Sequence, residues 1–264
     1  MSSPTYILHH NLKSLCSIMV RYTLAVRGPP KAFELKFEEQ VVDIFNEEQL
    51  SEHFLCEVNS MGQVPVLTSP ALSKPIADSL EITHWLAKLY PLLIPESYSS
   101  QISSFLERLH ALNFFSLSFP GRPQVANGFK AAAEKRLAGD ITERYRKALL
   151  YKIEVLKRDK IGGLQPEVTA AMSKLAQTLL IDLESVLPIP DKDSVHHKSG
   201  PWLFGLEHPT ALDAHLLPFI SRLRDVGRQE LIPAKLGEYA DLALETPEWK
   251  KLTVENLVLI PKTV

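Results

Sequence analysis

Residues 59–91 constrain the fold more than any other stretch of the chain. Residues 64–67 (VPVL) are apolar and β-branched, which predicts a short buried strand with proline at its start. Residues 68–75 are rich in serine and proline and predict a turn. Asp78 and Ser79 then mark the N-terminus of a helix, either as simple caps or as a site whose free N–H groups suit a carboxylate ligand. The apolar stripe of this helix consists of Ile82, Trp85, Leu86 and Leu89.

The residues before this segment predict a small α/β layer. A first buried strand is predicted over residues 5–10, followed by a loop over residues 11–15 and a helix that ends near Gly28. A second strand is predicted at the start of residues 33–45, and a short helix or helical turn over residues 47–58. The resulting order, β-α-β-α-β-(β)-α, is that of a thioredoxin-like layer.

The composition changes beyond residue 91, where the signals for strands nearly vanish. Residues 91–100 form a bridge rich in proline and serine, and we place a domain boundary there, between an α/β domain of residues 1–91 and an all-helical domain of residues 100–264. Thr210 and Asp213 resemble a capping box at the start of a strongly apolar central helix. Other helices are predicted over residues 103–119, 130–158, 166–187 and 236–244, with a polar loop over residues 188–201.

Composition argues against several classes of function. With 29 Lys and Arg against 31 Asp and Glu, the net charge gives no sign of a nucleic-acid or anionic-membrane partner. No apolar run is long enough to span a bilayer, and residues 1–10 lack the features of a secretory signal. The two cysteines, Cys16 and Cys56, fit a reducing compartment, so a cytoplasmic protein is expected. The nine histidines show no metal-ligand spacing, so no metal is expected.

Two stretches of the chain resemble the glutathione transferases. FLCEVNSMGQVPVL followed by IADSLEITHWLAKLYP is similar to the family's signature, and WLFG…HPTALDAHLLPFISRL is similar to its core helix with the capping box. The resemblance implies a glutathione-binding domain over residues 1–91 and a helical domain over residues 100–264 that forms the pocket for an electrophile. It also implies a cis bond between Val64 and Pro65 in the glutathione-binding strand. Residues 121–163 look longer than the family norm. They would widen or cover a substrate pocket, or form a surface elaboration.

The resemblance also implies which residues bind glutathione as co-substrate. The backbone of Val64 would pair with the cysteinyl part, as a peptide does when it adds to a free strand edge. Asp78 would pair with the γ-glutamyl ammonium, and Ser79 with the γ-glutamyl carboxylate. Gln49 falls where zeta-like members place a glutamine near the glycyl carboxylate, and Gln63 flanks the strand and would assist.

The chemistry needs an ionised glutathione thiol, because the thiolate is the nucleophile. A hydroxyl donor or a helix N-terminus lowers the thiol pKa below its ordinary value of about 8.5. LHHNLKSLCSIMVRYTLAV resembles the zeta-class segment Ser-Ser-Cys-Ser before a Val-Arg helix, with Ser14, Cys16 and Ser17 kept and Leu15 in place of the second serine. Ser14 thus takes the place of the hydroxyl that donates to sulfur, with Ser17 in reserve; without the resemblance, either serine is a helix cap.

Cys16 admits two interpretations. Near a helix N-terminus its pKa would be lowered, and it would form a mixed disulfide with glutathione, as in omega-like and glutaredoxin-like relatives. The chain has no Cys-x-x-Cys, however, and a buried cysteine is a common inert core residue. We therefore favour an inert or supporting role for Cys16.

The second substrate, a small hydrophobic electrophile, is expected against the helix that follows the bridge. An aromatic stripe on a helix, however, more often belongs to the core than to a pocket. A homodimer is expected from the family. The candidate pocket residues are His110, Asn113, Phe114 and Phe115.

These residues together predict a glutathione transferase. Addition of the thiolate to an activated double bond would give a conjugate, or a cis–trans isomer if the adduct eliminates after bond rotation. The departures from ordinary detoxifying members favour a dedicated substrate, as in secondary metabolism. Two alternatives stay open: a non-catalytic glutathione-binding or regulatory module, and a thiol transferase that uses Cys16.

Overall fold

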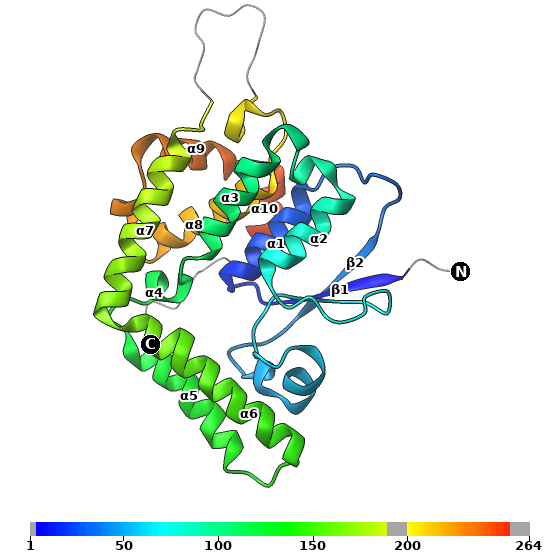
Figure 1. Cartoon of the computed structure of the whole chain (residues 1–264), viewed down its shortest axis with the longest axis vertical. Coiled ribbons are helices and arrows are strands. Elements are labelled where there is room, and N and C mark those ends of the chain that lie inside the picture. The colour runs from blue at the N-terminus through cyan, green and yellow to red at the C-terminus, as the bar shows by residue number, and fades with distance from the viewer. Residues whose placement is uncertain (1–3, 189–199, 254–264) are drawn as a thin grey trace, which may run out of the picture. The chain divides into compact units, whose positions relative to one another are not determined.

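The computed structural model describes residues 4–188 and 200–253 (Figure 1). In chain order, a mixed β-sheet with intervening helices is followed by a mostly helical region, so the predicted fold class, thioredoxin-like α/β then all-helical, is confirmed. The strands are β1 (Thr5–His10), β2 (Lys36–Val41) and β3 (Val66–Thr68). The helices are α1 (Leu15–Val26), α2 (Ser79–Leu89), α3 (Ser99–His110), α4 (Phe114–Ser118), α5 (Pro123–Leu137), α6 (Glu143–Val155), α7 (Pro166–Glu184), α8 (Ala211–Asp225), α9 (Ala234–Ala243) and α10 (Pro247–Thr253).

Backbone contacts divide the chain into two compact units. The sheet unit comprises Met1–Ser17, Leu35–Ser79 and Asn113–Ser173, and it holds the three strands together with α4, α5 and α6. The helical unit comprises Ile18–Glu34, Leu80–Leu112 and Lys174–Val264, and it holds most of α1, α2 and α7 together with α3, α8, α9 and α10. The domain boundary at residues 91–100 stays a prediction.

Strand β1 lies at the centre of the sheet, in the order β2-β1-β3, and has the predicted bounds. It runs parallel to β2 and antiparallel to β3, so Leu8 lies opposite both Glu39 and Leu67. Strand β2 begins at Lys36 rather than near residue 33, and it is mostly exposed, as an edge strand often is. Leu67 and Ile76 form an isolated bridge, so the fourth strand allowed for in the predicted order is reduced to one residue pair.

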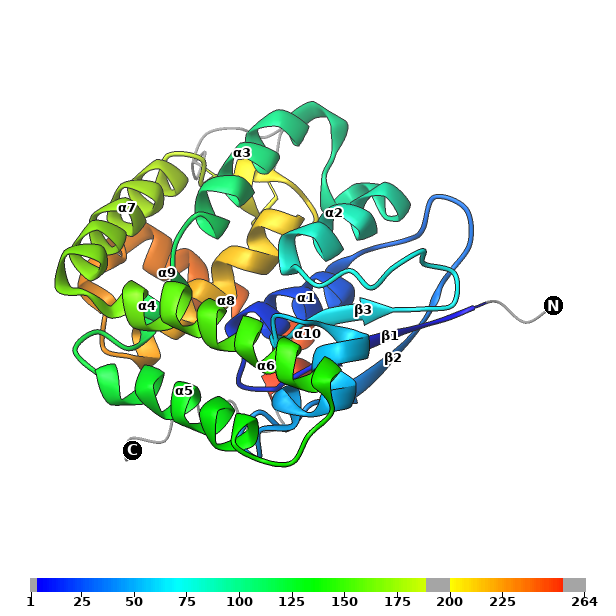
Figure 2. The same cartoon turned by 60° about the horizontal axis from the view of Figure 1, so that its bottom comes forward.

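The connection between β2 and β3 holds the core of the sheet unit. Where a short helix or helical turn was predicted, the chain forms a 3-10 helix (Glu48–Leu50) and a π-helix (Phe54–Val58). One side of this connection packs in an apolar cluster with the sheet, through Val42, Phe54, Val58 and Val66. The other side packs on α5 and α6, which lie side by side as an antiparallel hairpin (Figures 1 and 2). This second cluster consists of Leu50, Leu55, Ala133, Tyr145, Leu149, Ile153 and Leu156.

The prediction of a helix over residues 130–158 is wrong, because the chain turns between α5 and α6. Helix α5 ends at Leu137, and Gly139 follows in the turn. The Thr142 hydroxyl then accepts the N–H of Tyr145 (3.1 Å) and caps the start of α6. The apolar spacing continues across this turn, so periodicity alone did not reveal it.

The single helix predicted over residues 103–119 is likewise two helices, α3 and α4. The side chain of Asn113 accepts the N–H groups of Phe115 and Ser116 (both 3.1 Å) and starts α4. A side chain that satisfies the first N–H groups of a helix favours a new start over continuation.

The helical unit is built around α8, which is buried along almost its whole length. The predicted capping box is confirmed: the Thr210 hydroxyl accepts the N–H of Leu212 (3.2 Å), and the Asp213 carboxylate accepts the N–H of Thr210 (2.7 Å). Asp213 also accepts hydrogen bonds from the N–H of Leu203 and the hydroxyl of Tyr239. Burial raises the pKa of the Asp213 carboxyl, and these hydrogen bonds act in the opposite direction.

The C-terminal elements differ in one respect from the prediction. The last predicted helix is α9, but a further helix, α10, follows it. Most of the predicted loop at residues 188–201 and the tail after residue 253 lie outside the described residues. Within the described ranges, no helix is long and apolar enough to cross a lipid bilayer.

Loss of the capping box should lower stability. Thr210→Ala should reduce the free energy of unfolding by about 1–2 kcal/mol, because the buried N–H groups at the start of α8 lose their acceptor. Urea unfolding followed by far-ultraviolet circular dichroism measures this. Thr178→Ala, at an exposed position within α7, is the control and should have an effect close to zero. Equal losses in the two variants would contradict the role of the cap.

Candidate functional site

The loop between β1 and α1 is held by Asn11, which is buried. Its Nδ2 donates to the carbonyl of Val42 (2.8 Å), its Oδ1 accepts the N–H of Lys13 (2.9 Å), and its own N–H donates to the hydroxyl of Ser17 (3.2 Å). These bonds fix where α1 begins relative to the sheet. The prediction from sequence did not include Asn11, although asparagine after a strand is a typical turn residue.

The start of α1 alternates between exposed and buried side chains. Ser14 and Cys16 are partly exposed, whereas Leu15 and Ser17 are buried. The Ser14 hydroxyl accepts the N–H of Ser17 (3.4 Å) and donates to the carbonyl of Val64 (3.5 Å). The bond to Val64 is long and weak, so a charged acceptor would replace it at little cost. Of the two serines predicted as donors, Ser14 is therefore the accessible one.

The loop that leads to Pro65 is shaped by Asn59. Its Nδ2 donates to the carbonyl of Gln63 (2.9 Å), and its Oδ1 accepts the N–H of Met61 (3.0 Å). The bond between Val64 and Pro65 is cis, as the resemblance implied. Gln63 and Val64 are partly exposed, and Pro65 is buried.

Asp78 and Ser79 lie at the N-terminal end of α2, where the helix was predicted to begin. Asp78 is exposed and Ser79 is buried. The N–H groups and partial positive charge of this end suit a carboxylate. All residues predicted to bind or activate glutathione belong to the sheet unit: Ser14, Cys16, Ser17, Gln49, Gln63, Val64, Pro65, Asp78 and Ser79.

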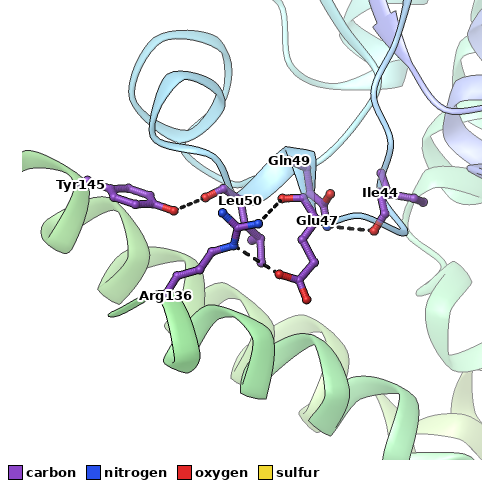
Figure 3. A network of polar contacts seen from close by, with 6 residues as sticks. All are labelled: Ile44, Glu47, Gln49, Leu50, Arg136 and Tyr145. Carbon is purple, nitrogen blue, oxygen red and sulfur yellow. Dashed lines mark hydrogen bonds and ion pairs between the residues drawn. The ribbon is translucent and has the colours of Figure 1, made fainter. Parts of the chain in front are cut away.

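Gln49 is buried in the connection between β2 and β3 (Figure 3). Its Nε2 donates weakly to the carbonyl of Ile44 (3.4 Å). Its Oε1 is enclosed and has no hydrogen-bond partner among the described residues. The amide thus contacts the backbone of its own loop, and its contact with the glycyl carboxylate stays a prediction.

The α5–α6 hairpin bonds to the same connection (Figure 3). Arg136 on α5 donates to the carboxylate and to the backbone carbonyl of Glu47, both at 3.3 Å. The Tyr145 hydroxyl on α6 donates to the carbonyl of Leu50 (2.5 Å). The long segment of residues 121–163 therefore packs on the polypeptide that leads to the cis proline.

Lys152 on α6 is buried, with 4% of its surface exposed. Its Nζ donates to the carbonyls of Met61 (2.7 Å) and Gly62 (3.1 Å). Burial lowers the pKa of the ammonium from 10.5 to about 7, with a smaller contribution in the same direction from the charge of Lys160 and an opposing one from Asp159. The prediction missed Lys152 because a lysine on an amphipathic helix is normally exposed.

Lys160 places a second cation near the start of α1. Its Nζ lies 4.5 Å from the centroid of the Phe115 ring, a cation–π contact. Burial lowers the pKa of Lys160, and negative charge on Cys16 and Asp159 acts in the opposite direction. Neither Cys16 nor Cys56 is in a disulfide. A thiolate at Cys16 would thus be stabilised electrostatically by Lys160.

The residues predicted to line an electrophile pocket have other contacts as well. Asn113 caps α4 and also donates to the carbonyl of Asp159 (2.9 Å). Phe115 is buried against Phe119 and Phe129, while Phe114 is partly exposed. A role in an electrophile pocket stays a prediction for these residues.

His110 belongs to the helical unit. Its Nε2 is 2.7 Å from Nδ1 of the buried His215, whose Nε2 is 2.8 Å from the hydroxyl of Thr83. Burial lowers the pKa of His215 well below its ordinary value, and charge on His110 and His84 acts in the same direction. The chain therefore keeps His215 neutral as a hydrogen-bonded core residue. In residues 4–188 and 200–253, no group of three or more His, Cys, Asp or Glu is placed to hold a metal ion.

A hollow of about 250 Å³ lies in the sheet unit, beside the start of α5. None of its lining residues was predicted as a site residue. The lining consists of Pro123, Ala126, Asn127, Ile161, Leu164 and Gln165.

No protein-family model and no curated protein sequence matches the chain, but solved structures do. The match to maleylpyruvate isomerase, a bacterial zeta-class glutathione transferase, covers 98% of this chain and 100% of that one, with 20% identity and a TM-score of 0.55. The match to maleylacetoacetate isomerase from Anaeromyxobacter dehalogenans 2CP-1, with glutathione in its active site, covers 100% of both chains, with 18% identity and a TM-score of 0.57.

The chain has the glutathione-transferase fold. A glutathione transferase from Pseudomonas putida, with glutathione disulfide bound, is also similar: the match covers 96% of this chain and 92% of that one, with 16% identity and a TM-score of 0.59. At these identities the likeness concerns the fold, and the chemistry has to be argued from the residues.

Lys152→Met should change how stability depends on pH. The pKa of Lys152 is about 7 in the folded protein against an ordinary value of 10.5, so between these pH values the unfolded chain holds a proton that the folded chain has released. Relative to the variant, the wild type should therefore gain up to about 1.4 kcal/mol of stability per pH unit over this range. Urea unfolding at a series of pH values measures the difference.

The control for this experiment is Lys147→Met, which removes an exposed lysine from the same helix. Its stability difference from the wild type should stay constant with pH over that range. If the difference for Lys152→Met is equally constant, the buried ammonium does not have a lowered pKa.

Proposed function

We propose that the protein binds glutathione in the sheet unit and adds its thiolate to a small electrophile. The observation that carries the proposal is the position of Ser14, whose accessible hydroxyl lies 3.5 Å from the carbonyl of Val64. A hydroxyl suited to stabilise a thiolate thus lies beside the backbone that would pair with the cysteinyl part of glutathione. The glutathione-transferase fold, with glutathione or glutathione disulfide bound in similar structures, supports the assignment.

Glutathione would lie extended along the residues that precede α2. The backbone of Val64 pairs with its cysteinyl part, Asp78 with the γ-glutamyl ammonium, and Ser79 with the γ-glutamyl carboxylate at the helix N-terminus. Gln49 contacts the glycyl carboxylate, and Gln63 assists from its position beside the strand. On this proposal residues 1–91 bind glutathione, and residues 100–264 supply the electrophile pocket.

Activation of the thiol rests on the start of α1. The Ser14 hydroxyl exchanges its weak bond to Val64 for one to the sulfur, and the partial positive charge of the helix N-terminus acts in the same direction. Each unit by which the thiol pKa falls requires about 1.4 kcal/mol of preference for the thiolate. A charged acceptor forms stronger hydrogen bonds than a carbonyl, so this exchange is favourable.

The reaction begins when the sulfur forms a bond to one carbon of an activated double bond, and the electron pair moves to the activating group. Protonation of the neighbouring carbon gives a conjugate. If the single bond rotates first and the thiolate leaves, the double bond reforms as the other isomer and glutathione is regenerated. Similar structures include two named isomerases, so the isomer as well as the conjugate should be looked for. The substrate that we propose is a dedicated biosynthetic one.

A second candidate function, thiol transfer through Cys16, is favoured by one observation. Cys16 is partly exposed in the first turn of α1, and Lys160 would stabilise its thiolate. In that case the Cys16 sulfur would attack a glutathione mixed disulfide and release the other thiol.

Ser14→Ala should raise the thiol pKa of bound glutathione by about 1–2 units, because the hydrogen-bonded thiolate loses a donor. Ultraviolet difference titration of the complex measures the thiolate directly. The affinity for glutathione should change much less, since the other contacts remain. Ser60→Ala, at an exposed position ahead of the cis proline, is the control and should match the wild type. Binding with an unshifted thiol pKa in the wild type would instead indicate a non-catalytic module.

Cys16→Ser separates the two candidate functions. Under our proposal this variant keeps a lowered glutathione pKa and forms conjugates at a rate within about threefold of the wild type, because Cys16 does not touch the reacting atoms. Under the second candidate, reduction of a glutathione mixed disulfide is abolished while Cys56→Ser leaves it intact. Loss of conjugation in Cys16→Ser, with the fold retained, would contradict the proposed mechanism.

A further inference from the structure

In the turn that precedes Val64, two backbone carbonyls accept hydrogen bonds from α6. The N–H of Gly62 donates to the carbonyl of Asn59 (2.8 Å), and the side chain of Asn59 bonds to Met61 and Gln63. These bonds leave the carbonyls of Met61 and Gly62 directed at α6, where Lys152 donates to both. The Nζ of one lysine therefore binds two successive carbonyls of the turn.

The turn is also shaped to admit the lysine. Gly62 has a φ of +57°, a conformation that favours glycine. A Cβ atom at Gly62 would lie 2.9 Å from Cδ2 of Leu55, 3.1 Å from the carbonyl oxygen of Gln49 and 3.1 Å from Cε of Lys152. The absence of a side chain thus allows α6 and the turn to approach each other closely.

Further bonds from the hairpin keep α6 in place against this segment. Arg144 donates to the carboxylate of Glu57 (2.5 Å) and to the carbonyl of Cys56 (2.7 Å), and the Tyr145 hydroxyl holds the carbonyl of Leu50. Leu149 and Ile153 on α6 also pack in one apolar cluster with Leu50 and Leu55 of this segment. Of these bonds from the hairpin, those of Lys152 reach the residues closest in sequence to Val64, because Met61 and Gly62 directly precede Gln63 and Val64.

We propose that Lys152 is a positioning residue of the glutathione site: it holds the carbonyls of Met61 and Gly62 and so fixes the backbone of Val64 for pairing with glutathione. This inference rests on the proposed function, in which Val64 pairs with the cysteinyl part. It assigns a role to the long hairpin of residues 121–163 in binding the co-substrate. Lys152 acts through the turn and does not itself touch glutathione.

Lys152→Met removes the donors while keeping a side chain of similar length. It should weaken the binding of glutathione and of S-methylglutathione alike, by about tenfold, because the hydrogen bonds from Lys152 to both carbonyls are lost. The thiol pKa of the glutathione that does bind should stay as in the wild type, since Ser14 is untouched. Isothermal titration calorimetry and ultraviolet difference titration measure the two quantities. Lys147→Met, which also removes one positive charge from α6 but at an exposed position, should bind both ligands as the wild type does.

Hydrogen–deuterium exchange of the unliganded protein separates positioning from a general loss of stability. In Lys152→Met, exchange should rise in peptides that cover residues 59–68 and stay unchanged in β1 and α8. Lys152→Gln, which keeps one polar group but does not span both carbonyls, replaces the Met variant if that variant does not fold. Wild-type affinity in a folded variant, or faster exchange throughout the chain, would overturn the role of Lys152. Failure of the wild type to bind glutathione would instead overturn the proposed function.

Discussion

Backbone carbonyls that lie outside the sheet need donors, and in this protein the α5–α6 hairpin supplies them. The connection between β2 and β3 runs as short 3-10 and π-helical turns, so its carbonyls at Leu50, Met61 and Gly62 are not paired in a ladder. Tyr145 and Lys152 donate to them from α6. A buried carbonyl without a donor is costly, so these contacts decide which course this connection takes towards Val64.

The chemistry proposed for the protein depends on how the start of α1 is placed. Asn11 fixes the loop after β1, and the first turn then exposes Ser14 and Cys16 while it buries Leu15 and Ser17. The hydroxyl and the thiol are thereby available at one helix end, whose partial positive charge stabilises an anion. Both candidate functions therefore start from the same helix end.

Local sequence patterns predicted those elements well that depend on residues close together in the chain. The strand of residues 5–10 has its predicted bounds, and the Thr210–Asp213 capping box forms as expected, because both depend on neighbours in the sequence. The turns that divide α3 from α4 and α5 from α6 were missed, because apolar spacing continues across them. The shift of β2 to Lys36 has a similar cause: an exposed edge strand carries little alternation.

The sequence by itself determined the fold class, the position of the cis proline through a family resemblance, and the candidate residues Ser14, Asp78 and Ser79. Only the tertiary structure decided that Ser14 is accessible where Ser17 is not, and that Lys152 is buried against Met61 and Gly62. The physical reason is distance along the chain. A hydrogen bond between α6 and a turn some ninety residues earlier does not change the pattern of apolar residues in either segment. From the sequence alone, a lysine that donates to buried carbonyls cannot be distinguished from an exposed lysine.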